Sequence, residues 1–372
     1  MQTRFHHLLS PSIGTQRTLK SLHFGEAGRG EKVYLQASLH ADELPGMLVL
    51  HHLRPMLEAA EAAGRLRGEI VVVPVANPIG LAQTMMGDHM GRFEFASGEN
   101  FNRNYPDLAP LIERQIVGKL GTDAKANTAL IRSAIREQLA ALAARTELES
   151  LRLTLMSLAA DADVVLDLHC DLEAVLHLYT GTPLWAQCEP LARYTGAHAT
   201  LLATESGGHP FDEACGQTWW KLAEMFKGRF PIEPACLAVT IELRSENEVT
   251  HEQAQADAGR LYAFLVHRGV IADEVPAMPA LLQPATPLAG SESIVAPFPG
   301  VVSFYKRPGD WVEQGDAIFD VIDPLGDRCE TVRSQTAGVL YARESRRYAT
   351  AGQWMAKVAG RVAFKTGNLL SA

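Results

Sequence analysis

The sequence lacks the features of a secreted or membrane protein. Its five cysteines are scattered through 372 residues and form no CxxC pair, so reduced thiols are the simplest account and a disulfide framework is disfavoured. The N-terminus has no apolar segment of the signal-peptide type, and no stretch approaches about 18 unbroken apolar residues. These absences predict a cytoplasmic protein.

The chain also lacks an excess of positive charge. Its formal net charge is −9, which argues against nucleic acid or an anionic membrane surface as a main partner. No acidic or basic run is long enough to form a charged tail. The composition, 47% hydrophobic and 21% charged, is that of a globular protein with a sizeable core.

Strand-like and helix-like segments alternate over the first three quarters of the chain. Continuous apolar runs of this kind are typical of strands covered on both faces, and alternation with helices favours a parallel sheet. We therefore predict an α/β fold with a mixed, mostly parallel sheet flanked by helices. Strands are expected at 32–39, 69–78, 164–171 and 236–246, and helices after Pro45, within 108–146, after Thr146 (with Glu149 as a capping partner) and over 251–270.

The composition changes near residue 273. Segment 273–293 holds four prolines with little periodicity and is expected to be a linker or extended strap. The rest looks all-β and has a faint internal repeat that resembles the half-motifs of a biotinyl/lipoyl-type sandwich, but its central hairpin, "DPLGDRCET", carries no lysine. We predict a catalytic domain over 1–275 and a strap with a β-rich domain over 276–372, whose role is structural or gating.

The first candidate for chemistry is "SLHADELPG" at 38–46. It places His40 and Glu43 three positions apart, where a predicted strand turns into a predicted helix. At such a turn an imidazole and a carboxylate can face one ion, and a catalytic zinc site needs about three protein ligands. Alone the pattern is weak, because a polar loop with a glutamate near a helix N-terminus accounts for it more simply.

The second candidate is "VVLDLHCD", which places His169 at the end of a buried strand. Sites in open α/β sheets gather at the carboxyl ends of strands, so a histidine there is difficult to explain as core. Asp167 lies two residues back on the same face of the strand. It is either a partner that orients a ligand histidine or a hydrogen-bonded core aspartate.

Two further segments carry polar groups that are candidates for chemistry. Arg92, Asn102 and Arg103 lie in an irregular Gly- and Asn-rich segment, where arginines can clamp carboxylates. Either arginine alone is more simply a surface residue. Glu242 follows Val-Thr-Ile in an apolar strand, and a carboxylate there is costly unless it is paired or functional. Glu246 and Glu248 compete with Glu242. Burial raises the pKa of a carboxyl, which suits a general base.

In this order the four pieces resemble the zinc carboxypeptidase-like superfamily. Within it, the start of the pattern and the β-rich C-terminal part are similar to the succinylglutamate desuccinylase/aspartoacylase family. The resemblance spans about residues 30 to 360. The family usually has Gly-x-His-Gly-x-Glu, whereas here Leu39 and Ala41 flank His40, and Asn100 precedes a Phe-Asn-Arg-Asn-Tyr-Pro run closer to the peptidase branch.

The resemblance implies a role for each candidate. His40, Glu43 and His169 would bind one Zn²⁺ per chain, and Glu242 would act as base and acid. Arg92 would polarise the scissile carbonyl, while Asn102 and Arg103 would hold a substrate carboxylate.

The function implied is a zinc-dependent deacylase that cleaves the amide bond of small N-acyl amino acids or related compounds. A zinc metallocarboxypeptidase acting on peptides and a metal-free binding module that keeps the fold are the alternatives. The acyl group, the amino acid and assembly into a homo-oligomer stay open.

Overall fold

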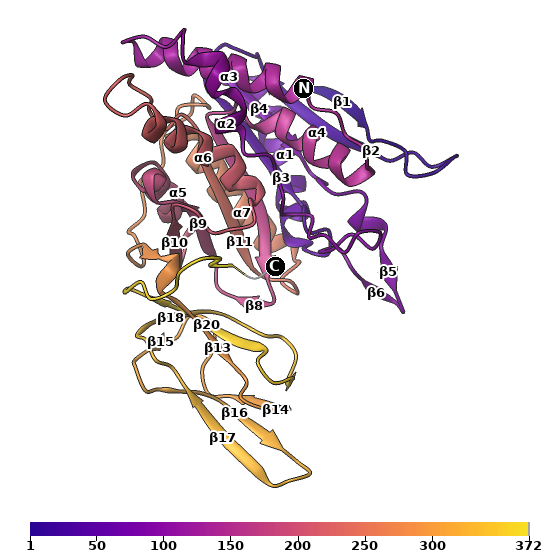
Figure 1. Ribbon diagram of the computed structural model, residues 1–372, viewed down its shortest axis with the longest axis vertical. Coiled ribbons are helices and arrows are strands. Elements are labelled where there is room, and N and C mark those ends of the chain that lie inside the picture. Colours follow the sequence, from indigo (N-terminus) through magenta and orange to yellow (C-terminus); the bar gives the residue numbers. More distant parts are fainter. Residues whose placement is uncertain (371–372) are drawn as a thin grey trace.

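A nine-stranded mixed sheet forms the centre of the N-terminal part of the computed structural model, which describes residues 1–370 (Figure 1). Its order is β1-β2-β4-β3-β7-β11-β9-β10-β12. Five neighbouring pairs are parallel and three are antiparallel, so the expected mixed, mostly parallel sheet is confirmed. The strands are β1 Gln2–His7, β2 Thr18–Gly25, β3 Lys32–Ala37, β4 Glu69–Val73, β7 Val164–Asp171, β9 His177–Gly181, β10 Ala199–Ala203, β11 Leu237–Ser245 and β12 Thr286–Pro287.

Helices cover both faces of this sheet (Figure 1). One face packs against α1 Pro45–Ala62, α5 Trp185–Thr195 and α7 His251–His267. The other packs against α2 Leu108–Ile116, α3 Ala124–Ala141, α4 Glu147–Ala159 and α6 Phe211–Met225. Neighbouring residues of β3 therefore point into different cores, as Val33 and Tyr34 do, and both are fully buried. Burial on two faces is the reason that these strands read as unbroken apolar runs.

The helical stretch expected at 108–146 consists of two helices, α2 and α3, which are separated by a loop, and α3 ends before α4 begins. At the start of α4 the hydroxyl of Thr146 accepts a hydrogen bond from the backbone N–H of Glu149 at 3.1 Å, as the capping pattern predicted. The Glu149 carboxylate accepts from the backbone N–H of Arg145 at 2.6 Å rather than from Thr146, so the reciprocal bond is displaced by one residue. Within residues 1–370 the structure holds no helix long and apolar enough to cross a membrane.

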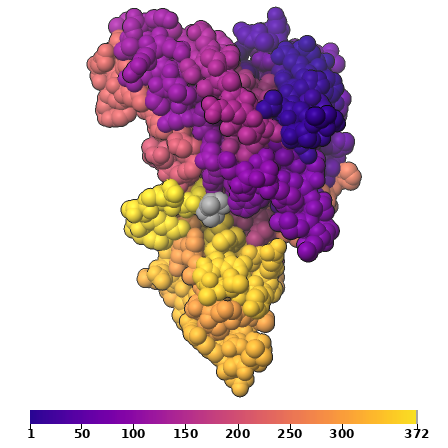
Figure 2. All heavy atoms as spheres, turned by 45° about the vertical axis from the view of Figure 1, so that its right-hand side comes forward, coloured from indigo at the N-terminus to yellow at the C-terminus, as the bar shows by residue number. Residues whose placement is uncertain are grey.

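Beyond residue 290 the regular structure is all β, as expected, and it forms two further sheets. Figure 2 shows this part, in orange and yellow, tapering away from the larger N-terminal part. One sheet has the order β13-β20-β18-β15, with β8 paired to β18, and the other the order β17-β16-β14-β19. The strands are β8 Glu173–Ala174, β13 Ser291–Val295, β14 Gly300–Phe304, β15 Trp311–Val312, β16 Ala317–Asp323, β17 Arg328–Arg333, β18 Gly338–Arg343, β19 Tyr348–Ala349 and β20 Trp354–Gly360.

The two parts are joined by pairing as well as by the chain. Strand β8, which follows β7, pairs with β18 of the C-terminal part, and β12 of the predicted strap pairs with β10 of the large sheet. The biotinyl/lipoyl-type relationship and the domain boundary at 275/276 stay predictions. The remaining short elements are the hairpin β5 Thr84–Met85 and β6 Asp88–His89, and the 3-10 turns Gly80–Ala82, Thr182–Leu184 and Leu288–Gly290.

Candidate active site

Three neighbouring strands bring the sequence-predicted residues to one edge of the sheet. Strands β3, β7 and β11 run parallel and side by side, so their carboxyl ends meet. His40 and Glu43 follow β3, and His169 lies near the end of β7. Glu242 of β11 is the register partner of His169. Residues more than a hundred positions apart therefore meet at the strand ends, where α/β sheets place their sites.

The loop after β3 is held tightly against the sheet. Ser38 is fully buried and has a φ of 64°, a left-handed conformation that turns the chain out of the strand. The position of Gly46 leaves no room for a side chain, because a Cβ there would lie 2.9 Å from Cβ of Ala37 and 3.0 Å from Cβ of Leu168. The first turn of α1 thus packs directly on β3 and β7 and fixes the loop between them.

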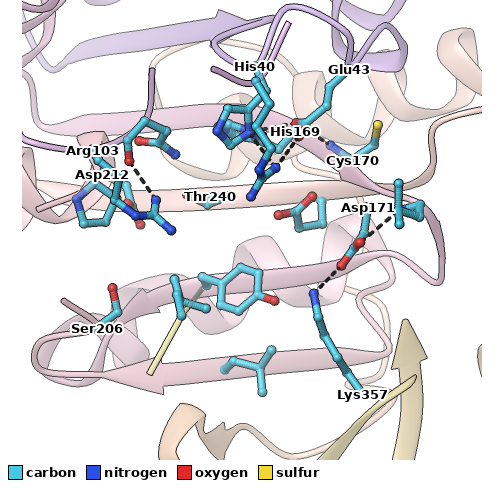
Figure 3. A pocket seen from close by; sticks show the side chains of 18 of the residues that line it. His40, Glu43, Arg103, His169, Cys170, Asp171, Ser206, Asp212, Thr240 and Lys357 are labelled. Atoms are coloured by element: carbon cyan, nitrogen blue, oxygen red, sulfur yellow. Dashed lines mark hydrogen bonds and ion pairs between the residues drawn. The ribbon is translucent and has the colours of Figure 1, made fainter. Parts of the chain in front are cut away.

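His40, Glu43 and His169 form a compact group of potential metal ligands (Figure 3). One ligand atom of each lies within 4.8 Å of the others. The Nδ1 atom of His40 lies 2.9 Å from Oε1 of Glu43, and Nδ1 of His169 lies 2.7 Å from Oε2. The predicted ligand set is brought together, and these three side chains could hold one metal ion.

The hydrogen bonds of His40 leave its Nδ1 atom free of a proton. Oδ1 of Asn100 accepts the backbone N–H of Asn102 at 2.8 Å, so it is an acceptor, and Nε2 of His40 donates to it at 2.9 Å. On the other side of the ring, Nη1 of Arg92 donates to Nδ1 at 3.2 Å. Nδ1 therefore presents a lone pair toward Glu43, as a metal ligand must.

A fully buried carboxylate lies beside the far nitrogen of His169. Its Nε2 lies 3.0 Å from Oδ2 of Asp167, whose Oδ1 accepts from Nε2 of Gln36 at 2.9 Å. Burial alone would lower the pKa of His169, but the carboxylates of Asp167 and Glu43 outweigh it and raise that pKa well above its usual value. This position therefore favours positive charge, which suits a cation between the two histidines.

Glu242 lies on the neighbouring strand β11 as the register partner of His169. Its Oε2 is buried and has no hydrogen-bond partner within residues 1–370. Burial raises the pKa of Glu242 to about 8, and the charge of Glu43 adds to the effect while His169 opposes it. A carboxyl in this state can exchange a proton near neutral pH.

The arginine predicted to polarise a carbonyl lies against the ligand group. Nη1 of Arg92 lies 3.4 Å from Oε1 of Glu43 in addition to its bond with His40. The side chain is 42% exposed, so a molecule in the cavity can reach it.

Asn102 and Arg103 also line the cavity, but Asn102 has a structural bond that the sequence did not suggest. Its Oδ1 accepts the backbone N–H of Phe211 at 2.8 Å and so holds the first turn of α6. Arg103 donates to the backbone carbonyl of Asn102 at 2.7 Å and lies across Gly208, where a Cβ would meet its Cδ at 2.7 Å.

The cavity around these groups has a volume of about 410 Å³, and most of the charged side chains in its wall are acidic. The C-terminal part contributes to it through Glu344, Trp354, Lys357 and Leu370. Nζ of Lys357 bonds to Oδ2 of Asp171 at 2.8 Å (Figure 3). Eight acidic and three basic side chains line the cavity: Asp42, Glu43, Asp171, Asp212, Glu213, Glu242, Glu246 and Glu344, and Arg92, Arg103 and Lys357.

Sequence reasoning missed the contribution of the C-terminal part and of α6. Lys357 and Trp354 lie in a strand whose pattern is that of any half-buried strand. They are so far from His169 in the sequence that nothing local indicates that they line the same cavity. Asp212 and Glu213 looked like ordinary first-turn acids of a helix. Their burial, rather than their spacing, marks them.

Comparison with known proteins agrees with this arrangement. The family model of the succinylglutamate desuccinylase/aspartoacylase catalytic domain matches residues 29–118, which include the loop of His40 and Glu43. A search of curated proteins finds no match.

Solved structures extend the similarity over almost the whole chain. A succinylglutamate desuccinylase/aspartoacylase family protein from Shewanella amazonensis is 28% identical, with a TM-score of 0.83 over 96% of this chain and 98% of that one. One from Shewanella frigidimarina is 26% identical, with a TM-score of 0.85 over 96% and 97%. The ectoine utilization protein EutE from Ruegeria pomeroyi, 16% identical over 96% and 94% of the chains with a TM-score of 0.68, shares the fold. The family model and these structures support the resemblance to the succinylglutamate desuccinylase/aspartoacylase family.

Proposed function

We propose that this protein is a zinc-dependent hydrolase that removes the acyl group from small N-acyl amino acids. The observation that carries the proposal is the convergence of His40, Glu43 and His169, with ligand atoms within 4.8 Å of one another, beside Glu242. The match to the family's catalytic-domain model and the similar solved structures support a hydrolase of this type.

Zinc fits this donor set. Two imidazole nitrogens and one carboxylate match the three protein ligands of catalytic zinc sites, which leave a further position open. Asn100 accepts a hydrogen bond from Nε2 of His40, and the Asp167 carboxylate lies 3.0 Å from Nε2 of His169, so the Nδ1 atoms of both rings face Glu43. Bound zinc would act as a Lewis acid that polarises the scissile carbonyl and makes water a better nucleophile.

Glu242 is proposed as the group that moves the proton. Hydrolysis breaks the amide C–N bond, forms a C–O bond to the oxygen of water, and leaves a protonated amine. The unpartnered Oε2 of Glu242 can take the proton from the attacking water and deliver it to the leaving nitrogen. Arg92, held at the ligand group, can donate to the oxygen on which negative charge develops.

Arg103 and Asn102 are proposed to position the substrate. A guanidinium can pair with a carboxylate through two parallel bonds, which fixes orientation as well as adding affinity. Because Asn102 already holds α6 through Oδ1, its role includes fixing the cavity wall beside Arg103. These contacts supply the orientation that turns a bimolecular reaction into an effectively unimolecular one.

The cavity favours small substrates over peptides. Side chains of the C-terminal part, including Trp354, Lys357 and Leu370, wall a cavity of about 410 Å³. A volume of this size lies at the small end of ligand sites and suits an acylated amino acid better than an extended peptide. A metallocarboxypeptidase needs an open groove, and it remains the second outcome of the test below.

The test is a hydrolysis screen on purified protein, first stripped with a chelator and then reloaded with zinc. N-acetyl and N-succinyl amino acids are compared with short peptides. We expect zinc-dependent release of the amino acid from the N-acyl substrates and little cleavage of the peptides. Glu242→Gln should retain zinc and lose about 10²- to 10⁴-fold in kcat.

The matched control is Glu248→Gln. Glu248 follows β11, the strand that carries Glu242, and its carboxylate does not line the cavity. It should keep wild-type turnover. Cleavage of peptides but not of N-acyl amino acids would favour the carboxypeptidase. Absence of bound zinc, with no gain of activity on its addition, would favour a metal-free binding module.

A further inference from the structure

One end of the cavity is walled by uncharged side chains from β9, β10, the turn Leu288–Gly290 and segment 361–370. Within residues 1–370, none of the acidic or basic side chains that line the cavity belongs to these segments. The mechanism above gives this end no function. We call its five largely apolar members the apolar wall: Tyr179, Leu201, Ala203, Leu288 and Leu370.

The apolar wall is one continuous surface. Leu201 and Leu288 belong to a packed apolar cluster. Tyr179, Ala203 and Leu370 pack against that cluster and remain half-buried. Burial raises the pKa of Tyr179 well above its usual value, so its phenol group stays neutral. The wall therefore presents uncharged and largely apolar surface to the cavity.

Contact between the two parts of the chain accounts for only some of this surface. The same cluster contains residues of β18 and β20, so it helps to join the C-terminal part to β10. That role needs the fully buried members of the wall. It leaves the half-buried faces of Tyr179, Ala203 and Leu370 on the cavity, and apolar surface there favours an apolar occupant.

The register of the sheet shows how far the wall lies from the ligand group. Thr240 of β11 pairs with Asp167 of β7 on one side and with Tyr179 of β9 on the other. Tyr179 in turn pairs with Leu201 of β10. The row of residues begins at Asp167, two positions before His169, and ends at the wall. Its ends are three strand spacings apart, which is about 14 Å.

The backbone of a small substrate does not reach the wall. An acetylated amino acid spans two residue lengths of extended chain, about 7 Å. With its amide at the ligand group, its backbone therefore ends short of β9. About 7 Å remain between that point and the wall. A long aliphatic or aromatic side chain of the amino acid fills this distance, as does a longer acyl chain.

The substrate carboxylate decides which half of the substrate faces the wall. Arg103, proposed above to hold that carboxylate, lies across Gly208. The backbone N–H of Asn104 donates to the carbonyl of Gly208 at 2.9 Å, so Arg103 lies beside the loop that leaves β10. Figure 3 shows Arg103 and Ser206 of that loop toward one side of the cavity and Glu43 toward the other. The amino acid, rather than the acyl group, therefore faces the apolar wall.

We propose that the apolar wall binds the side chain of the substrate amino acid, so that the preferred substrates are N-acyl derivatives of amino acids with a long aliphatic or aromatic side chain. The inference rests on the proposed function and names its substrate class. The scissile amide lies at the ligand group, the carboxylate at Arg103 and the side chain against the wall. Removal of the apolar side chain and the wall from water supplies the affinity.

The test measures kcat/KM of the zinc-loaded protein on Nα-acetyl derivatives of alanine, 2-aminobutyrate, norvaline and norleucine. Each methylene buried at the wall should raise kcat/KM about fourfold, which amounts to about 50-fold over the series. Methionine and glutamine have side chains of nearly equal length. The methionine derivative should be preferred by about 10- to 100-fold, because the wall offers the glutamine amide no partner. Lengthening the acyl group on alanine from acetyl to hexanoyl should give a smaller gain than lengthening the side chain.

Variants at Ala203 assign the preference to the wall. Ala203 is half-buried at the end of β10, so a change there disturbs the fold less than one at the fully buried Leu201. Ala203→Leu takes up the space for the side chain and should lower the norleucine-to-alanine ratio of kcat/KM by about tenfold. Ala203→Asp places a charge there and should lower the methionine-to-glutamine ratio by about tenfold.

The matched control is Ala140→Leu, an exposed change on α3 outside the cavity, which should leave both ratios unchanged. Because each readout is a ratio measured on one preparation, a smaller amount of folded protein does not alter it.

Each outcome decides a different point. No gain along the alkyl series, a preference for the glutamine derivative, or a larger gain from the acyl chain would overturn this inference and leave the proposed function standing. Unchanged ratios in both variants at Ala203 would do the same. No hydrolysis of any N-acyl substrate by the zinc-loaded protein would remove the proposed function. In that case calorimetry with free norleucine and free alanine decides the inference: equal or absent binding of the two would overturn it.

Discussion

The ion pair between Asp171 and Lys357 offers a quantitative test of how the C-terminal part is attached. Asp171 ends β7, and Lys357 lies in β20, 186 positions later. Their side chains are 12% and 23% exposed, and Nζ lies 2.8 Å from Oδ2. Burial alone would raise the pKa of Asp171, but Lys357 outweighs it and lowers that pKa. The charged pair therefore stabilises the folded state.

The perturbation is Lys357→Met, which keeps the apolar length of the side chain and removes the ammonium. Breaking a fully buried pair costs about 3–5 kcal/mol because it leaves an uncompensated charge. The residual exposure of this pair lowers the expected loss in the free energy of unfolding to about 2 kcal/mol. For a chain of this size that corresponds to a fall in Tm of about 3 °C.

The assay is urea unfolding followed by circular dichroism, with thermal scans beside it. The double variant Asp171→Asn/Lys357→Met should recover most of the loss, because no charge is left unpaired. Lys227→Met, at a pair that is about three-quarters exposed, is the control and should cost under about 0.5 kcal/mol. If Lys357→Met costs no more than this control, the pair does not stabilise the junction and the reasoning is refuted.

Further predictions concern the metal site, pH and the C-terminus. Asp167→Asn should weaken zinc binding by about 10- to 100-fold in a chelator competition assay, because His169 loses the carboxylate that orients it; an unchanged affinity would contradict this. Burial alone would raise the pKa of Asp161, but the charges of Lys32 and Arg136 outweigh burial and lower that pKa. The ionised carboxylate therefore stabilises the fold fully above the usual pKa of an aspartate, and this stabilisation is lost as the pH falls below that value. The stability difference between wild type and Asp161→Asn, measured by urea unfolding, should shrink from about pH 7 to about pH 3.5, and a constant difference would refute the assignment. Deletion of 367–372 should raise the rate on bulkier N-acyl substrates in the hydrolysis assay, because Leu370 walls the cavity, and an unchanged substrate range would count against that role.

Local pattern predicted the sheet well because its strands are buried on both faces. An apolar run such as that around Val33 is typical of a strand covered by helices on each side, and Pro45 marks the start of α1 where the structure has it. The ligand group was also predictable, since His40, Glu43 and His169 each follow or end such a strand. Sequence position at a strand end was enough to place them at one edge.

The rest of the site depends on contacts that no local pattern encodes. Lys357 lies in β20, which pairs with β18, and β18 in turn pairs with the two-residue strand β8, a pairing that the sequence does not specify. Asp212 and Glu213 become unusual only through burial, and helix propensity alone makes them ordinary. The hydrogen bond from the backbone N–H of Phe211 to Asn102 also joins residues far apart in the sequence, so no local pattern predicts it.

The most direct test of the central claim is the zinc content of the purified chain and its ligand variants. Elemental analysis after dialysis should find about one zinc per wild-type chain and close to none in His169→Ala, with activity lost in parallel. His52→Gln, a change in a histidine on the α1 surface, should keep both. Full zinc occupancy in His169→Ala, or a fully active wild-type protein after its metal is removed, would contradict the account.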